Sequence, residues 1–255
     1  MSEAKKTPLY QAHLNQGAKM VEFAGWLMPI QYEGLKEEHL QVRSKMGIFD
    51  VSHMGEIDVK GPRALETLEW VTTNSVSKLK AGQAQYSLFP NEQGGIVDDL
   101  IVYCIQPGEH YVLCVNAANT DKDFAYLIKN NRGADIVNVS DKWGQLAIQG
   151  PQAIGLMSKV LGMECGAIES FHFAPVEFEG QTCYVARTGY TGEDGVEVFV
   201  PWELTEKLWE ACFAQSGGEL KAIGLGARDT LRTEKKYSLY GQEITDVTNP
   251  FEAGL

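Results

Sequence analysis

The hydrophobic pattern is strongest in residues 96–103, where it predicts a central strand of a sheet. A turn signal of Asn, Glu, Gln and two glycines at 91–95 precedes it, since glycine adopts positive φ at little cost. Successive side chains of a strand face opposite ways. Here both faces are apolar, and each carries one carboxylate, Asp98 or Asp99. A buried carboxylate is costly unless it is paired, so at least one needs a partner: a backbone N–H, an arginine, or the N–H of a ligand.

The same pattern predicts helices and strands along the rest of the chain. Helices are predicted at 8–16, 34–46, 63–70, 117–130 and 202–215, and from Gly226 onward. Further strands are predicted at 21–26, 57–59, 110–116, 135–139, 143–149, 182–187 and 196–200. Thr7 is expected to cap the first helix, and Asn116, at the end of a strand, is expected to cap the helix that follows it.

A weak internal repeat suggests two similar units. Gly61-Pro62 and Gly150-Pro151 each follow a predicted strand and precede a helix, and a glycine-rich hairpin comes after each helix. Gly-Pro turns are common, so the repeat alone could be chance. We expect an α+β fold of two interleaved antiparallel-sheet units with flanking helices. Residues 1–50 and 141–255 are assigned to the first unit and residues 51–140 to the second.

A second strand carboxylate, Glu197, follows the glycine-rich loop at 189–195, as Asp99 follows the turn at 91–95. Two carboxylates that approach one cavity from related units are stronger evidence for a functional site than either carboxylate alone. Arg228, at the start of a predicted helix, is either a bidentate partner for a carboxylate or a structural ion pair with Asp229 or another nearby acid. His53 is interpreted as a hydrogen-bonded core or turn residue rather than a catalytic one.

Composition excludes several classes of function. The net charge is −12, and no Lys/Arg run is long enough to follow a phosphate backbone, so no nucleic-acid partner is expected. The apolar runs are too short for a membrane span. The five cysteines are scattered without a C-x-x-C pair and the histidines stand apart, which predicts reduced thiols and no metal site. The N-terminus lacks a secretory signal, so a cytoplasmic location is expected.

Several motifs spread along the whole chain carry a family resemblance. They are the segments 7–10 (TPLY), 23–26 (FAGW), 49–54 (FDVSHM), 94–103 (GGIVDDLIVY), 187–195 (RTGYTGEDG), 224–232 (GLGARDTLR) and 239–241 (LYG). No single segment is decisive, but together and in this order the chain resembles the aminomethyltransferase family, the T proteins of the glycine cleavage system.

The resemblance implies an enzyme that binds tetrahydrofolate in a central cavity. An aminomethyl group carried on the lipoyl arm of the partner H protein would lose ammonia, and its one-carbon unit would pass to the folate to give 5,10-methylenetetrahydrofolate. In the family pattern Asp99 is the catalytic carboxylate, Glu197 contacts the pterin and Arg228 contacts the folate. The resemblance also implies pocket-lining roles for a further four residues, Tyr190, Asn116, Tyr86 and Met54. It implies no metal.

The chain departs from the family pattern in two places. Family members continue past the point where this chain reaches Leu255, into a third, β-rich domain. The resemblance therefore implies that this domain is absent here, and it leaves the activity of the chain as given open. The second departure is Lys235-Lys236-Tyr237, where the family usually has Ala, then a small or basic residue, then an apolar one. This difference concerns local packing more than chemistry.

Three other interpretations remain. The first is a folate-dependent relative that uses another methyl donor, such as a sulfonium demethylase or the folate-binding half of a dimethylglycine or sarcosine oxidase. The second is a non-catalytic folate-binding protein of the iron–sulfur assembly kind. That group carries Lys-Gly-Cys-Tyr, whereas residues 187–190 here read Arg-Thr-Gly-Tyr. The third is an α+β binding domain in which Asp99 and Glu197 are simply hydrogen-bonded to turns.

Overall fold

The computed structural model describes residues 3–255 and divides into two compact units. The first comprises the chain up to His53 and Asp141–Tyr237, and the second comprises Met54–Ser140 and Ser238–Leu255. Both contain helices and antiparallel strands, so the α+β class is confirmed. Residues 238–255 were assigned to the first unit from the sequence but lie in the second. The reason is that Ile244 packs with Leu88 and Ile96 there.

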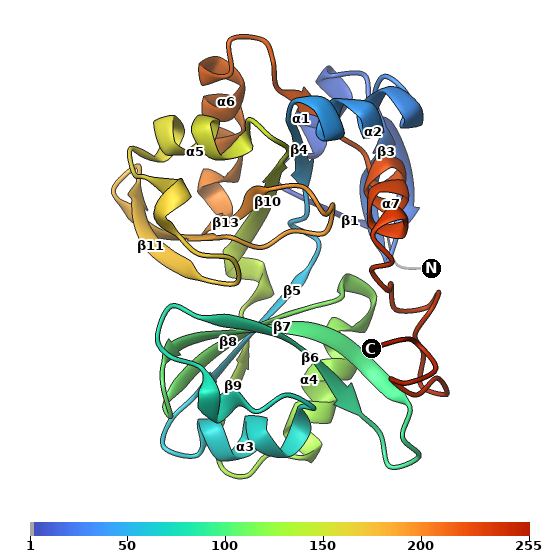
Figure 1. Cartoon of the computed structure of the whole chain (residues 1–255), viewed down its shortest axis with the longest axis vertical. Helices are drawn as coiled ribbons and strands as arrows, with labels where there is room; N and C mark the ends of the chain where they lie inside the picture. The colour runs from blue at the N-terminus through green and yellow to red at the C-terminus, as the bar shows by residue number, and fades with distance from the viewer. Residues whose placement is uncertain (1–2) are drawn as a thin grey trace. The chain divides into compact units, whose positions relative to one another are not determined.

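A mixed sheet forms the centre of the first unit (Figure 1). Its strands lie in the order β11 (Phe173–Phe178), β12 (Gln181–Ala186), β13 (Gly195–Pro201), β10 (Trp143–Gln149), β4 (Gly47–Asp50) and β14 (Lys221–Ala222). Neighbours are antiparallel except β14, which runs parallel to β4. Three of these strands, β4, β11 and β14, were not predicted from the sequence.

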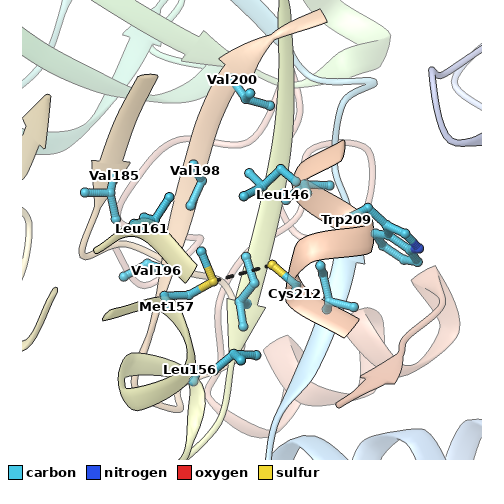
Figure 2. Close-up of a cluster of buried hydrophobic side chains, with 14 of the residues drawn as sticks. Leu146, Leu156, Met157, Leu161, Val185, Val196, Val198, Val200, Trp209 and Cys212 are labelled. Carbon is cyan, nitrogen blue, oxygen red and sulfur yellow. Dashed lines mark hydrogen bonds between the residues drawn. The ribbon is translucent and has the colours of Figure 1, made fainter. Parts of the chain in front are cut away.

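Helices α5 (Ala153–Leu161) and α6 (Thr205–Gln215) pack against this sheet. Figure 2 shows side chains from both helices meeting aliphatic residues of β10 and β13, with the Cys212 thiol 3.6 Å from the sulfur of Met157. Val196 and Val198 belong to this core. Because strand side chains alternate, Glu197 lies on the opposite face of β13, as its sequence position predicts.

A small sheet and three helices complete the first unit. The sheet contains β1 (Lys5–Lys6), β3 (Trp26–Gln31) and β2 (Lys19–Phe23), and the helices are α1 (Tyr10–Asn15), α2 (Leu35–Ser44) and α7 (Leu225–Glu234). The prediction of a single strand at 21–26 was wrong, because Ala24 and Gly25 adopt positive φ (52° and 80°) and turn β2 back onto β3. The capping role of Thr7 was also wrong, since its hydroxyl donates to Asp50 instead.

A fully antiparallel sheet forms the second unit. The order is β6 (Ala84–Pro90), β7 (Ile96–Gln106), β8 (His110–Val115), β5 (Gly55–Lys60) and β9 (Asp135–Asn138). Helices α3 (Ala64–Val71) and α4 (Thr120–Lys129) pack against it, and Leu68 and Leu127 share a core with Leu100 and Val102 of β7. The central strand predicted at 96–103 is therefore confirmed as β7.

Short 3₁₀ turns link several of these elements: η1 (Val76–Lys78), η2 (Ala117–Asn119), η3 (Ser140–Lys142), η4 (Cys165–Ala167) and η5 (Trp202–Leu204). The internal repeat has a structural counterpart. Gly61 follows β5 and leads to α3, and Gly150 follows β10 and leads to α5. Both adopt positive φ, 93° and 125°, which glycine alone adopts readily. Within residues 3–255, no helix has the length and apolar composition needed to cross a membrane.

Candidate active site

Asp99 lies on β7 beside two hydrogen-bond donors of the second unit. β6 pairs with β7 so that Leu88 faces Asp99, and Tyr86, two residues earlier on β6, shares that face. The Tyr86 hydroxyl donates to Oδ2 of Asp99 over 3.1 Å, and Nδ2 of Asn116 donates to Oδ1 over 2.7 Å. The structure thus brings together three of the residues that the sequence singled out.

Asp98 points to the helix-covered face of the sheet and is fully buried. The backbone N–H of Asn116 donates to its Oδ2 over 3.1 Å. Its Oδ1 accepts from Nδ2 of Asn116 over 3.0 Å and from Nδ2 of Asn119 over 2.7 Å. The Asn116 amide therefore links Asp98 to Asp99. The expectation that Asn116 caps the next helix was wrong, because its side chain makes no capping hydrogen bond.

The Asp99 carboxyl can exist in both protonation states near neutral pH. Burial, followed by the negative charge of Asp98, raises its pKa to about 7, although the hydrogen bonds from Asn116 and Tyr86 act in the opposite direction. Perturbed carboxyls of this kind gather at functional sites. A protonated carboxyl group with this pKa can lose its proton when a cation approaches.

Glu197 forms the second carboxylate centre, in the first unit. It is 8% exposed, and its two oxygens accept from Thr188 Oγ1 over 2.5 Å and from Gln145 Nε2 over 3.3 Å. A carboxylate offers about four acceptor positions, so the two protein donors leave capacity for two more. Glu197 is therefore oriented by its neighbours and is still able to accept hydrogen bonds from a ligand.

Arg228 and Tyr190 lie together in the first unit. The Arg228 guanidinium is 4.7 Å from the centre of the Tyr190 ring, close enough for a cation–π interaction. Tyr190 also stacks on Tyr237, with ring centres 5.9 Å apart. Asp229, considered as an ion-pair partner for Arg228, forms its ion pair with Arg232 over 2.8 Å. An aromatic and cationic surface of this kind suits a flat, electron-rich ring.

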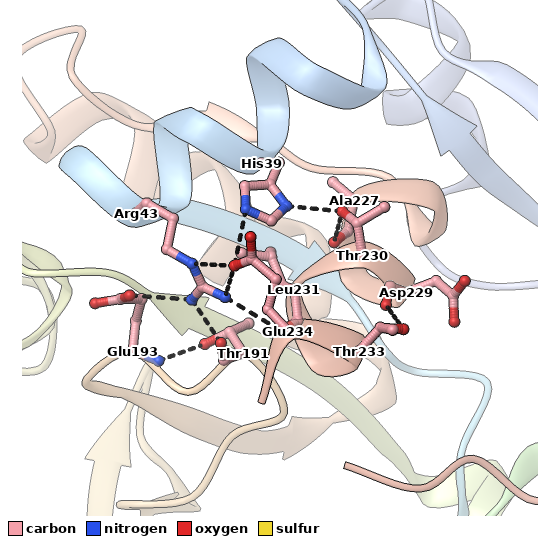
Figure 3. Close-up of polar contacts among 10 residues, drawn as sticks. All are labelled: His39, Arg43, Thr191, Glu193, Ala227, Asp229, Thr230, Leu231, Thr233 and Glu234. Carbon is pink, nitrogen blue, oxygen red and sulfur yellow. Dashed lines mark hydrogen bonds and ion pairs between the residues drawn. The ribbon is translucent and has the colours of Figure 1, made fainter. Parts of the chain in front are cut away.

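Arg43 of α2 connects the glycine-rich loop to α7, as Figure 3 shows. Its Nη1 donates to the Thr191 carbonyl over 2.6 Å and to Glu193 Oε1 over 3.0 Å. Its Nη2 donates to Glu234 Oε2 over 2.8 Å and to the Leu231 carbonyl over 3.2 Å. Arg43 thus ties the loop that contains Tyr190 to the helix that contains Arg228. Sequence reasoning did not identify this residue.

Met54 and His53 lie in the segment between β4 and β5. Met54 is half-buried in the segment that leads into β5. His53 is buried and lies edge-on to Phe23. Burial is the main cause that lowers the pKa of His53 to about 4, and the Arg228 charge lowers it further against the opposing charge of Asp50. His53 is therefore neutral at pH 7 and is a core residue, as interpreted from the sequence. The hydrogen bonding expected of it was wrong for Nδ1, which is buried and has no hydrogen-bond partner within residues 3–255.

Among residues 3–255, no group of three or more His, Cys, Asp or Glu side chains is arranged to hold a metal ion. The side chains described above are oriented carboxylates, amides, a phenol and a guanidinium. In the second unit these are Asp99, Tyr86 and Asn116; in the first they are Glu197, and separately Arg228 with Tyr190. Such groups bind nitrogen-rich rings and stabilise positive charge.

The chain is a protein of the GCVT class, since the family model for the GCVT N-terminal domain matches residues 9–255. The crystal structure of the glycine cleavage system aminomethyltransferase T from Bartonella henselae superposes with a TM-score of 0.90. That match has 37% identity and covers 97% of this chain and 67% of the other.

Curated relatives agree with the structural match. Aminomethyltransferase from Bdellovibrio bacteriovorus is 59% identical over 253 residues, which cover 98% of this chain and 70% of the relative. Aminomethyltransferase from Desulforamulus reducens is 50% identical over 257 residues, which cover all of this chain and 70% of the relative. The chain therefore belongs to the glycine cleavage T protein family and is an aminomethyltransferase.

Proposed function

We propose that the chain transfers a one-carbon unit from an aminomethyl group on the lipoyl arm of H protein to tetrahydrofolate. The carbon–sulfur and carbon–nitrogen bonds of the aminomethyl group break, and two carbon–nitrogen bonds to the folate form. The two folate N–H hydrogens leave with the thiol and the ammonia, and the product is 5,10-methylenetetrahydrofolate. The observation that carries this proposal is the oriented Asp99 carboxyl, whose pKa is raised to about 7.

Asp99 is proposed to act by electrostatic stabilisation. A folate nitrogen displaces the ammonia, and departure of the thiol then leaves a cationic, iminium-like carbon on the folate; a carboxylate held beside this carbon lowers the energy of that species. The cation favours the ionised form of Asp99, so a carboxyl that is partly protonated in the free protein becomes fully charged when the cation forms. Tyr86 and Asn116 each donate to one Asp99 oxygen and would keep it oriented meanwhile.

Glu197 is proposed to accept two N–H hydrogen bonds from the pterin ring of the folate. Its two protein donors fix the plane of the carboxylate, and paired N–H donors match the geometry of a carboxylate. Arg228 and Tyr190 are proposed to contact the folate through charge and ring stacking. Met54 is proposed as a further apolar contact.

A cytoplasmic location is proposed for the reaction. All five cysteines are buried as thiols, as expected for a protein of a reducing compartment.

The binding part of this proposal is tested by calorimetric titration of tetrahydrofolate into the 255-residue chain. We expect Glu197→Gln to weaken binding by at least about ten-fold, because an amide replaces one acceptor oxygen with a donor group facing the ring N–H groups. Glu203→Gln is the matched control, since Glu203 is exposed and accepts only a 3.3 Å contact from Gln181. Equal affinity for all three proteins would remove Glu197 from the proposed folate site.

The catalytic part is tested with Asp99→Asn. We expect turnover of the aminomethyl donor to be abolished while tetrahydrofolate binding falls only modestly, because the amide keeps the shape of the side chain but not its charge. Normal turnover would exclude Asp99 as the catalytic carboxylate. If the parent chain binds tetrahydrofolate but transfers nothing from the lipoyl-linked donor, the result would instead favour a non-catalytic folate-binding protein or an enzyme with another methyl donor.

A further inference from the structure

A second carboxyl group, that of Asp123, lies behind Asp98 in the second unit. Asp123 is on α4, and its side chain is fully buried. Within residues 3–255, no hydrogen-bond donor reaches either of its oxygens. Its neighbour is the carboxyl group of Asp98, which is within hydrogen-bonding reach. A buried carboxylate without any donor is one of the least stable arrangements in a protein interior.

The two carboxyl groups have unequal surroundings. Asp98 accepts three N–H hydrogen bonds, from the backbone of Asn116 and from the amides of Asn116 and Asn119. Asp123 accepts none, so the proton belongs to Asp123. Burial and the adjacent Asp98 both raise the pKa of Asp123 far above its ordinary value. The Asp99 charge acts in the same direction and Lys122 in the opposite one.

The hydrogen-bond capacity of Asp98 fits this assignment. An ionised carboxylate has about four acceptor positions, and the three N–H donors leave one unused. A protonated Asp123 supplies one O–H donor. Its hydrogen would satisfy both groups at once, since Asp123 gains a partner and the acceptor capacity of Asp98 is filled.

We propose that Asp123 is a positioning residue for Asp99, and that it acts by donating its carboxyl hydrogen to Asp98. Asp98 then holds one hydrogen of the Asn116 amide over 3.0 Å, while the other is directed at Asp99 over 2.7 Å. The order of contacts is Asp123, Asp98, Asn116, Asp99. This inference rests on the proposed catalytic role of Asp99. It adds that the buried Asp123 helps to orient Asp99.

The protonation of Asp123 is tested by infrared difference spectroscopy at neutral pH, which needs no activity. We expect the spectrum of the parent minus that of Asp123→Asn to contain the C=O stretching band of a protonated carboxylic acid. Asp121→Asn, an exposed change on the same helix, should give a carboxylate band instead. A carboxylate band for Asp123 as well would overturn the proposal.

The positioning role is tested by kinetics. Asp123→Asn keeps an N–H donor toward Asp98, so we expect kcat to stay within about two-fold of the parent. Asp123→Leu removes the donor, and we expect kcat to fall about ten- to a hundred-fold with little change in KM for tetrahydrofolate. Asp121→Leu is the control and should leave both constants unchanged. An equal loss in Asp123→Asn and Asp123→Leu would contradict the proposal.

A double-mutant cycle separates positioning from general structural support. If Asp123 acts through Asn116, Asp123→Leu should cost nothing further in kcat when Asn116→Ala is already present. A purely structural role would give additive losses, and this outcome would overturn the inference. A parent chain without any transfer activity would count against the proposed function, whereas the infrared result would still decide the protonation of Asp123.

Discussion

The hydroxyl of Thr188 donates a 2.5 Å hydrogen bond to Oε2 of Glu197. Thr188 follows β12, and Glu197 lies on β13 opposite Ala186 of β12. The contact therefore connects the two neighbouring strands next to the loop that joins them. Both side chains are buried. The threonine therefore fixes one oxygen of the carboxylate proposed to contact the pterin, and leaves the orientation of the other to the weaker contact from Gln145.

Replacing Thr188 with valine should weaken tetrahydrofolate binding. A hydrogen bond to a charged group contributes about 1.5–3 kcal/mol, so the change predicts a loss of affinity of about ten-fold or more in calorimetric titration. Thr182→Val is a matched control, because Thr182 lies on an exposed part of β12 and its hydroxyl makes a similar contact with Glu177 of β11. If both variants bind as the parent does, Thr188 has no part in holding Glu197 for a ligand.

The pH dependence of the reaction should follow the ionisation of Asp99. Its pKa is raised to about 7 by burial and by Asp98, and the ionised form is the one proposed to stabilise a cation. We therefore expect kcat/KM to rise with pH, to reach half its maximum near pH 7 and to level off above about pH 8. Tyr86→Phe removes a donor that lowers this pKa, so the acid limb should move to higher pH.

Tyr126→Phe provides the comparison for Tyr86→Phe. The Tyr126 hydroxyl, also in the second unit, donates to the Pro90 carbonyl over 2.8 Å rather than to a carboxylate. Its loss should leave the acid limb where it is. A limb that stays in place in Tyr86→Phe, or that moves to lower pH, would show that the group observed in the profile is not Asp99.

Acid should destabilise the first unit through Asp50. Burial alone would raise the pKa of Asp50, but the hydrogen bonds from His13, Thr7 and Ser52 and the charge of His13 lower it below its ordinary value. A lowered folded-state pKa stabilises the protein above the unfolded-state value of about 3.9, and this contribution is lost as the pH falls through the folded-state pKa.

The substitution Asp50→Asn tests this contribution. At pH 7 we expect a loss of stability of about 2–4 kcal/mol, because the amide cannot accept all of these bonds as well as a carboxylate does. The difference from the parent should shrink as the pH falls below about 4, because the unfolded chain then binds a proton at Asp50 before the folded protein does. Thermal unfolding from pH 3 to pH 8 measures it, with Asp141→Asn, an exposed change in the same unit, as the reference. A deficit that does not change with pH would contradict the assignment.

The sequence predicted the positions of Asp99 and Glu197 well because strand alternation is a local property. Residues two apart in a strand lie on the same face. A glycine turn followed by aliphatic residues was therefore enough to assign each carboxylate to a strand and to one of its faces. The same holds for the two Gly-Pro turns, since a positive φ at Gly61 or Gly150 is required by the turn itself.

The partners of these groups could not be predicted in the same way. Asn116 has the sequence of a helix cap, yet its amide donates to Asp99, 17 residues earlier on another strand. Thr7 likewise precedes a proline and a helix, but its hydroxyl donates to Asp50, 43 residues later. In both cases a charged acceptor brought near by the tertiary fold competes with the local backbone for the same donor, and sequence spacing does not reveal that acceptor.

Arg43 provides a test of how the glycine-rich loop is held. Its guanidinium makes hydrogen bonds to the carbonyls of Thr191 and Leu231 and to the carboxylates of Glu193 and Glu234 (Figure 3). A lysine ammonium has the same charge but lacks the planar fork that reaches these acceptors together. Arg43→Lys should therefore lower stability by about 1–2 kcal/mol and speed hydrogen exchange at residues 189–195. Arg63→Lys, at a surface ion pair with Glu66, should change neither.

The effect of Arg43 on the ligand should follow from the loop. Tyr190 lies between Thr188 and Thr191 and faces Arg228 on α7. Arg43 makes hydrogen bonds to both this loop and that helix. Loosening the loop should therefore weaken tetrahydrofolate binding without moving the acid limb set by Asp99, because Asp99 is oriented by Tyr86 and Asn116 instead. Titration calorimetry and the pH profile of Arg43→Lys, measured on the same preparation, distinguish the two effects. A shifted acid limb with unchanged folate affinity would show that Arg43 does not act through the loop.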